Sequence, residues 1–181
     1  MDYDLEIQRK EILYLFEEYI VNGKSKKYSI RGFSKYLNKT TSYIYGFFKN
    51  SDELYHELYV LKIKDFDDNL NIISYSPIND IILFTVKLIE HFYLHKKVYY
   101  AIPRHIQYAH LRKYIYEKYY IMVVNIKKDG KVKVKANEET ITELLLYLFM
   151  GFITMNTSLP KDDAIKLIKK TIMNFITTYF K

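Results

Sequence analysis

The chain has 181 residues, enough for one compact domain or for a small domain joined to a medium one. Hydrophobic residues make up 49% of it and charged residues 27%, a balance that supports a packed core and excludes a disordered or collagen-like chain. The formal net charge is +7, and the absence of cysteine excludes a disulfide framework, a thiolate nucleophile and a cysteine zinc site.

Helix breakers are scarce, with 5 glycines and 3 prolines, whereas tyrosine and phenylalanine number 20 and 11. This balance favours long helices around an aromatic core. The N-terminal sequence MDYDLEIQRKE has three acids among its first six residues and no apolar run, so it does not fit a secretory signal peptide. The longest nearly apolar stretch, residues 144–155, is shorter than the ~20 residues that cross a bilayer. We therefore expect a cytoplasmic protein.

Residues 5–20 form the first predicted helix. Ile12, Phe16 and Ile20 recur at helical spacing and make its apolar stripe. The helix is expected to end near Gly23, because glycine permits the left-handed backbone conformation that closes many helices. A basic connector follows.

Two short helices are predicted next. Ser29 is a suitable N-cap for the first of them, and Asn38 can adopt a positive φ that ends it. Thr40 can cap the second helix, because its hydroxyl accepts a hydrogen bond from an amide two or three residues further on. Two short capped helices joined by a two-residue turn form a helix-turn-helix. The residues expected to face the core are Ile30, Phe33, Leu37, Ile44, Phe47 and Phe48.

The positive charge is concentrated in this part of the chain. The interval between Glu18 and Asp52 contains no acid, and its basic residues are Lys24, Lys26, Lys27, Arg31, Lys35, Lys39 and Lys49. These residues account for the whole excess of +7, since the rest of the chain is formally neutral. Aromatic and aliphatic residues are interleaved with the basic ones, which indicates a folded unit rather than a solvated tail. A basic patch on a folded unit predicts a polyanionic partner.

Four helices are predicted in the middle of the chain. One starts at Asn50 or Ser51 and runs toward Leu70, and the next starts at Pro77 after a break at residues 74–77. A short helix over residues 96–102 stops before a proline, and a long one covers residues 104–128. Inward-facing residues of the first two are expected to be Leu54, Leu58, Leu61, Phe66, Ile78, Ile81, Ile82, Leu88, Ile89 and Phe92.

Two interpretations fit residues 129–135. Asp129-Gly130, followed by alternating lysine and valine, is compatible with a hairpin turn and a strand. Alternatively, Gly130 ends the long helix and a lysine-rich loop follows. We favour the helix end and the loop.

Two helices are predicted at the C-terminus. Asn137 caps an apolar helix over residues 138 to about 156, and Pro160 opens the last one. Between residues 141 and 155 the first of this pair is apolar nearly all round, so it needs more cover than a small domain provides. We expect the same helix pair of a second subunit to cover it, with a core helix inside one monomer as the alternative. The expected dimer-interface residues are Leu145, Leu148, Phe152, Ile168, Ile172, Phe175 and Tyr179.

A longer pattern covers the basic segment. Residues 28–54 read YSIRGFSKYLNKTTSYIYGFFKNSDEL. The positions that carry the pattern, without a gap from Ser29 onward, are Leu15-Phe16, Ser29-Ile30-Arg31, Phe33-Ser34, Ile44-Tyr45, Phe48 and Asp52-x-Leu54. This pattern resembles the DNA-binding head of the tetracycline-repressor (TetR) family. Asn38 replaces the family's usual turn glycine, Ser51 replaces its usual lysine, and about four extra residues separate the first two helices.

The resemblance implies an all-α fold. Residues 1–54 would be a three-helix helix-turn-helix head, and residues 55–181 a regulatory and dimerisation domain of about six helices, with the boundary inside the fourth helix. It further implies a homodimer that binds double-stranded DNA at an inverted-repeat operator and regulates transcription. The expected mode of action is repression, relieved by a ligand that the sequence does not identify.

The resemblance places the second helix of the motif in the major groove, where Thr41, Ser42 and Tyr43 are the expected base-reading residues. Because none of these is an arginine that can grip guanine, we expect weak discrimination per contact and a contribution from DNA shape. Phosphate contacts are expected from Ser29, Arg31, Lys39, Thr40, Tyr45 and Lys49. Core packing is the competing interpretation of Tyr45.

A ligand pocket for a small apolar or aromatic guest is expected among the middle helices, although aromatic stripes more often form core. The candidate lining residues are Phe84, Phe92, Tyr99, Tyr100, Tyr108 and Tyr147. His91 and His95 have the spacing of a shared metal site but lack a third ligand, so no metal or cofactor is predicted. No phosphate loop, nucleophile elbow or paired-carboxylate site is visible, and no enzyme is expected.

A function of another class also fits. A TetR-like helical adaptor would keep the fold but be controlled by a protein partner, without an operator of its own. Ser51, the lengthened connector and the lack of base-gripping side chains favour it.

Overall fold

The computed structural model describes residues 3–23, 28–70, 76–155 and 158–180, apart from the side chains of residues 3, 108 and 109. The described residues are 82% helical and contain no β-strand, which confirms the predicted all-α class. Within those same ranges, no helix combines the length and the apolar character needed to cross a membrane. The predicted basic connector with Lys24, Lys26 and Lys27, and the break at Ser74, lie outside the described residues.

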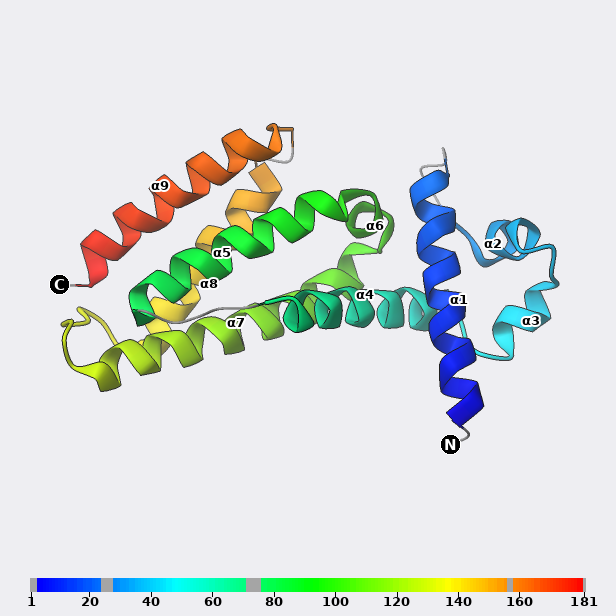
Figure 1. Ribbon diagram of the computed structural model, residues 1–181, viewed down its shortest axis with the longest axis horizontal. Coiled ribbons are helices and arrows are strands. Elements are labelled where there is room, and N and C mark those ends of the chain that lie inside the picture. Colours follow the sequence, from blue (N-terminus) through cyan, green and yellow to red (C-terminus); the bar gives the residue numbers. More distant parts are fainter. Residues whose placement is uncertain (1–2, 24–27, 71–75, 156–157, 181) are drawn as a thin grey trace. The chain divides into compact units, whose positions relative to one another are not determined.

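The helices follow one another with short connections (Figure 1). In chain order they are α1 (Tyr3–Asn22), α2 (Ile30–Tyr36), α3 (Thr41–Tyr45), α4 (Ser51–Asp68), α5 (Pro77–Leu94), α6 (Lys96–Ala101), α7 (Arg104–Asp129), α8 (Glu138–Met155) and α9 (Lys161–Tyr179). Each lies where the sequence pattern predicts a helix.

The chain divides into two compact units. The N-terminal unit comprises Met1–Asp67 and His95–Tyr108, and the C-terminal unit comprises Asp68–Leu94 and Ala109–Lys181. Short α6 therefore packs with the N-terminal helices, although α5 before it belongs to the C-terminal unit.

An aromatic cluster of Phe16, Tyr19, Phe33 and Tyr55 makes up part of the packing of the N-terminal unit. The Phe16 ring lies 4.9 Å from that of Phe33 and 5.2 Å from that of Tyr55, and Tyr19 lies 5.7 Å from Phe33, all between centroids. The Tyr55 hydroxyl donates to the carbonyl of Tyr28 (2.5 Å), and burial raises the pKa of Tyr55 to about 12. These rings join α1, α2 and α4, and each such pair contributes roughly 0.5–1.5 kcal/mol beyond area burial.

The same unit buries a lysine. Lys62 of α4 is only 3% exposed, and its Nζ lies 2.7 Å from Oε2 of Glu17 in α1 and 2.8 Å from Oδ2 of Asp65. Burial by itself lowers the pKa of Lys62, but the bonds to Asp65 and Glu17 outweigh burial and raise it, so the lysine stays charged. His95, just before α6, places Nδ1 3.3 Å from Oε1 of Glu17. This network joins α1, α4 and the start of the 95–108 segment.

The C-terminal unit is built around α5 and α9, which run side by side (Figure 1). Its core includes one buried pair of polar side chains. The Thr85 hydroxyl donates to the carbonyl of Ile81 (2.7 Å), so the proton of its 2.7 Å contact with Tyr119 comes from the tyrosine. Satisfied in this way, the two hydroxyls can remain in an apolar core.

The segment after α7 is a loop, as favoured, and not the strand of a hairpin. Gly130 ends α7 with φ +66°, and the Asn137 side chain caps α8 by accepting from the amide of Thr140 (2.7 Å). Between them, Val134 forms an isolated antiparallel bridge with Phe180 near the C-terminus. The segment of alternating lysine and valine therefore pairs with a distant residue at one position, Val134, and does not form a strand.

Lys62→Met should lower the free energy of unfolding by roughly 3 kcal/mol, because it leaves Glu17 and Asp65 without their shared cation in a site largely hidden from water. Lys64→Met, which removes an exposed lysine from the same helix, should change it by less than ~0.5 kcal/mol. Urea unfolding at neutral pH measures both. Equal effects of the two substitutions would contradict the claim that Lys62 stabilises the unit through Glu17 and Asp65.

The difference in the free energy of unfolding between wild type and Lys62→Met should depend on pH. Burial raises the pKa of Glu17, but the hydrogen bonds and charges of His95 and Lys62 outweigh burial and hold that pKa below its usual value. The stability contributed by Glu17 is thus present above its unfolded pKa of about 4.3 and is lost as the pH falls through the lower folded value. Unfolding measured at successively lower pH should show the difference narrowing below about pH 4.

Candidate nucleic-acid interface

The first helix of the motif, α2, begins at a side-chain cap. Ser29 has an extended backbone, and its hydroxyl accepts a hydrogen bond from the amide of Gly32 at 3.1 Å. Ile30 and Phe33 are buried, whereas Leu37 is half-buried. The cap and the apolar residues thus fix where α2 starts and which face it buries, as predicted.

The turn between α2 and α3 depends on Asn38. Its φ of 53° makes it the one non-glycine residue with a positive φ in the described part of the chain. The amide of Asn38 donates to the carbonyl of Lys35 (3.1 Å), and that of Lys39 donates to the carbonyl of Ser34 (2.9 Å). The backbone can therefore reverse within two residues, and the prediction for Asn38 is confirmed.

The second helix, α3, is short and capped at its start. The Thr40 hydroxyl accepts from the amide of Tyr43 at 3.3 Å, as predicted. Ile44 of α3 is fully buried, so its side of the helix faces the core; just beyond α3, Phe48 is fully buried and Phe47 is half-buried.

The opposite side of α3 carries the predicted base-reading residues. Ser42 and Tyr43 are exposed and Thr41 is half-buried. The Tyr43 ring is held between two neighbours: its centroid lies 5.3 Å from that of Phe47, and the Lys39 Nζ lies 5.5 Å from it. A tyrosine held in this way presents its hydroxyl and ring edge in a restricted direction.

The predicted phosphate-contacting residues are all exposed: Ser29, Arg31, Lys39, Thr40, Tyr45 and Lys49. Tyr45 is 51% exposed, so the competing interpretation of this residue as core packing is wrong. Lys35 is exposed as well. Every described cation of the basic segment is thus available to an external polyanion.

The predicted aromatic ligand pocket is not assembled by the described side chains. Phe84 is fully buried against Tyr119, 5.3 Å between centroids, whereas Tyr147 is 59% exposed. Tyr99 and Tyr100 belong to the other unit, where Tyr99 is buried against Tyr59 and Tyr100 is 54% exposed. Phe92 is half-buried, and the side chain of Tyr108 lies outside the described residues. The predicted pocket is not assembled because these rings either fill the cores of two separate units or face solvent.

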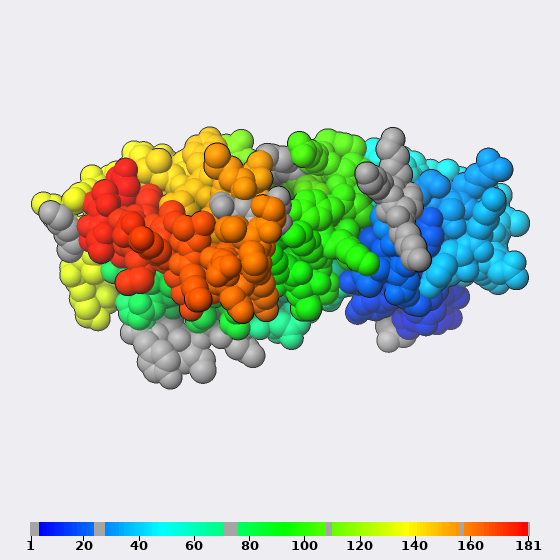
Figure 2. All heavy atoms as spheres, turned by 90° about the horizontal axis from the view of Figure 1, so that it is seen from above, coloured from blue at the N-terminus to red at the C-terminus, as the bar shows by residue number. Residues whose placement is uncertain are grey.

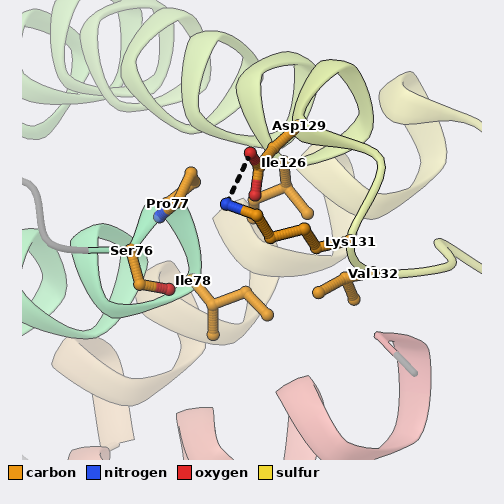
Figure 3. A pocket seen from close by; sticks show the side chains of 7 residues that line it. All are labelled: Ser76, Pro77, Ile78, Ile126, Asp129, Lys131 and Val132. Carbon is orange, nitrogen blue, oxygen red and sulfur yellow. Dashed lines mark ion pairs between the residues drawn. The ribbon is translucent and has the colours of Figure 1, made fainter.

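A cavity of about 190 Å³ does occur in the C-terminal unit (Figure 3). None of the predicted pocket residues lines it; its lining consists of Ser76, Pro77, Ile78, Ile126, Asp129, Lys131 and Val132. Lys131 Nζ lies 3.1 Å from Asp129 Oδ1 beside it. Ligand pockets usually measure ~300–1,000 Å³, so this cavity is small for a drug-sized guest.

The predicted interface residues of α8 and α9 need correction. Leu145, Ile168 and Ile172 are fully buried within the single chain, and Phe152 is nearly so. They form the core of the C-terminal unit and cannot touch a second subunit directly. The half-buried members of the predicted set are Leu148, Phe175 and Tyr179. The sequence shows that α8 is apolar but not how much of it the other helices already cover.

His91 and His95 do not lie on one helix. Helix α5 ends at Leu94, and the imidazole of His95 contacts Glu17. Among the described residues, no group of three or more histidines and carboxylates is placed to hold a metal ion.

Several solved structures are similar to the whole chain. PfmR, a TetR-family transcriptional regulator from Thermus thermophilus, has a TM-score of 0.64 at 12% identity, covering 92% of this chain and 94% of its own. NalD of Pseudomonas aeruginosa, the secondary repressor of the MexAB-OprM multidrug efflux pump, has a TM-score of 0.62 at 11% identity, covering 94% and 97%. A TetR-family regulator from Haemophilus influenzae has a TM-score of 0.59 at 13% identity, covering 99% and 100%. This chain therefore has the fold of TetR-family regulators.

No protein-family model matches the sequence, and no curated protein is significantly similar to it. At these identities the structures establish the fold, so the function has to be argued from the residues of the chain.

Asn38→Ala should lower the free energy of unfolding by about 1–2 kcal/mol, because alanine is strained at a φ of 53°. Asn38→Gly should change it by only a few tenths of a kcal/mol, since glycine adopts this conformation freely but loses more backbone entropy on folding. Asn38 is exposed, so neither substitution removes core packing. Urea unfolding of the two variants tests the claim, and equal destabilisation would rule out backbone conformation as the constraint.

Proposed function

We propose that this chain, which has the fold of TetR-family transcriptional regulators, is a homodimeric, sequence-specific DNA-binding repressor. The observation that carries the proposal is the exposed side of α3. It presents Thr41, Ser42 and Tyr43 from a side-chain-capped helix, within the segment that holds the entire excess of positive charge. A helix of this kind fits the major groove, where each base pair has a distinct pattern of donors and acceptors.

Base recognition would rest on hydroxyls and one ring. Thr41 and Ser42 can donate to or accept from base edges, and Tyr43 can contact a thymine methyl group while its hydroxyl bonds a base or a phosphate. Since the ring of Tyr43 is already held by Phe47 and Lys39, little side-chain freedom is lost on binding. The absence of an arginine from this side of α3 predicts a share of indirect readout of DNA shape.

Phosphate contacts would come from both ends of the motif. The exposed side chains of Arg31, Lys39, Tyr45 and Lys49, with the start of α2 at Ser29, can hold the DNA backbone on either side of the groove. Contacts of this kind position the protein but carry no sequence information directly.

A second copy of the chain would bind through the exposed face of α8. Tyr147, Leu148, Gly151 and Met155 follow at helical spacing, and all four are at least partly exposed. A Cβ atom at Gly151 would meet nothing within 4 Å beyond the local helix backbone, so contact of a Cβ with other parts of the chain does not require this glycine. Close approach of another helix would explain it. The neighbouring α9 forms much of the visible surface of the C-terminal unit (Figure 2) and supplies the half-buried Phe175 and Tyr179.

Repression would be relieved by a change in the separation of the two α3 helices. Two half-sites in adjacent major grooves require a spacing near one helical turn, ~34 Å. A ligand that binds better to a dimer with another spacing weakens DNA binding by its differential affinity for the two states. We take the cavity beside α5 and α7 as the candidate ligand site, and its volume admits only a small molecule.

An unbiased selection of bound DNA from random duplexes tests the proposal. Enrichment of one inverted repeat, bound with a steep dependence on salt, is the expected result. Uniform weak retention of all fragments would instead favour the adaptor, which is controlled by a protein partner. Repeating the selection with candidate metabolites tests release by a ligand.

Two substitutions should distinguish a residue that positions the protein on the DNA backbone from a residue that reads the bases. Arg31→Ala, which removes an exposed predicted phosphate contact, should weaken binding to all duplexes alike and flatten the slope of log affinity against log salt by roughly one unit. Tyr43→Ala should instead reduce the preference for the selected operator over a scrambled one. Titrations at several salt concentrations measure both quantities. A uniform loss in both variants would contradict this division of roles.

Gly151→Leu should weaken the dimer while leaving the fold of each chain intact. A Cβ atom has room at this position in the single chain, and leucine has a higher helix propensity than glycine, so helicity should not fall. At an interface the added side chain would separate the two copies of α8. Sedimentation equilibrium measures the change, with Lys113→Leu at an exposed position of α7 as the control. An unchanged dimer in Gly151→Leu would place the interface elsewhere.

A further inference from the structure

Arg9 of α1 is bound to the corner where α3 leads into α4. Its guanidinium donates to the carbonyl oxygen of Phe47 and to the carboxylates of Glu57 and Glu53, the last at 3.3 Å. It also lies over the ring of Phe48, 4.8 Å from the centroid. One side chain thus contacts four residues that are about forty positions away in the sequence.

These contacts require the shape of arginine. The planar guanidinium offers five donors in a rigid fork and stacks on aromatic rings, whereas a lysine ammonium is a single flexible point charge. Arg9, Glu53 and Glu57 are all partly buried, so water and salt screen these contacts less than those of an exposed pair.

The corner itself is joined from within by Glu53. Its Oε2 accepts from the amide of Lys49 (2.5 Å), while its own amide donates to Oδ1 of Asn50, the cap of α4 (2.9 Å). Arg9 binds the other oxygen of the same carboxylate. The exit of α3, the start of α4 and the N-terminal half of α1 therefore share one hydrogen-bond network.

Helix α3 depends on such external support. It has only five residues, and an isolated helix of that length is not stable in water. Its start is capped by Thr40, but its last turn consists of the amides of Gly46, Phe47 and Phe48 bonded to carbonyls of Ser42 and Ile44. Arg9 binds the carbonyl of Phe47, just beyond these bonds.

Arg9 is not placed as a phosphate contact. It lines a groove together with Glu6, Glu53 and Glu57, and the one other cation in that lining is Lys10. Acids thus outnumber bases, which disfavours a DNA backbone there.

We infer that Arg9 is a positioning residue: by holding the exit of α3 it sets the direction in which Thr41, Ser42 and Tyr43 meet the base edges. The inference rests on the proposed function where DNA is concerned, but its structural part, the fixed last turn of α3, is independent of DNA.

Two substitutions with opposite charge effects test it. Arg9→Gln lowers the charge of the N-terminal unit by one, and Glu57→Gln raises it by one, yet both loosen the same corner. Lys10→Gln and Glu11→Gln are the matched controls, since each makes the same charge change at an exposed position of α1. Arg9→Lys keeps the positive charge but removes the planar guanidinium with its five hydrogen-bond donors.

The first readout is the ratio of affinities for the selected operator and a scrambled duplex of equal length. This ratio should fall about tenfold in Arg9→Gln, to a smaller extent in Glu57→Gln and Arg9→Lys, and not at all in the two controls. A variant that is merely less folded loses affinity for both duplexes equally, so partial unfolding leaves the ratio unchanged. If Arg9→Gln and Glu57→Gln only shift total affinity, in opposite directions, Arg9 acts through its charge and the inference is wrong.

The second readout needs no DNA. Hydrogen exchange of the amides of Gly46, Phe47 and Phe48 should accelerate in Arg9→Gln and Glu57→Gln more than in their controls, while core amides of α5 stay protected. Unchanged protection of these three amides would overturn the inference. If wild type shows no sequence preference, the proposed function fails, and the exchange data still decide whether Arg9 fixes α3.

Discussion

The contact between the rings of Phe16 and Phe33 is the interaction on which the N-terminal unit depends. Helices of five and seven residues cannot hold their shape alone, so α2 and α3 depend on the residues that they bury within the N-terminal unit. The rings of Tyr19 and Tyr55 extend this contact on both sides. Because rings fill much of the core of so small a unit, few residues of α2 and α3 need to be buried, and their remaining side chains can face outward.

Helix α1 organises the polar contacts as well as the core. Toward its N-terminal end Arg9 binds the α3–α4 corner, and toward its C-terminal end Glu17 binds Lys62 and His95. The Nζ of Lys97 adds a hydrogen bond to the carbonyl of Val21 (2.8 Å). Apart from the bond of Lys97, these contacts pair acids of α1 and α4 with buried or half-buried basic side chains, whereas the described cations of the helix-turn-helix face solvent. The unit therefore separates charges used for folding from charges available to a partner.

The C-terminal unit divides the apolar residues of its helices between its core and its surface. Its core takes up Leu145, Ile168 and Ile172, which the sequence pattern suggested for an interface, and leaves Tyr147 and Met155 outside. An apolar helix can thus serve a core and a surface at once. The aromatic residues expected around a ligand are distributed between two cores and the solvent, so aromatic composition alone was a poor guide to a binding site.

Sequence alone was sufficient for the features that arise within a few residues. Ser29, Asn38, Thr40 and Asn137 act where predicted, because a cap or a positive φ depends on one side chain and the adjacent backbone. Only the tertiary structure decided which residues far apart in the chain meet: Arg9 with Phe47, Glu17 with Lys62, and Val134 with Phe180. It also decided which side of each apolar helix is covered. These outcomes depend on how whole helices pack, and no local pattern encodes which distant partner a side chain will reach.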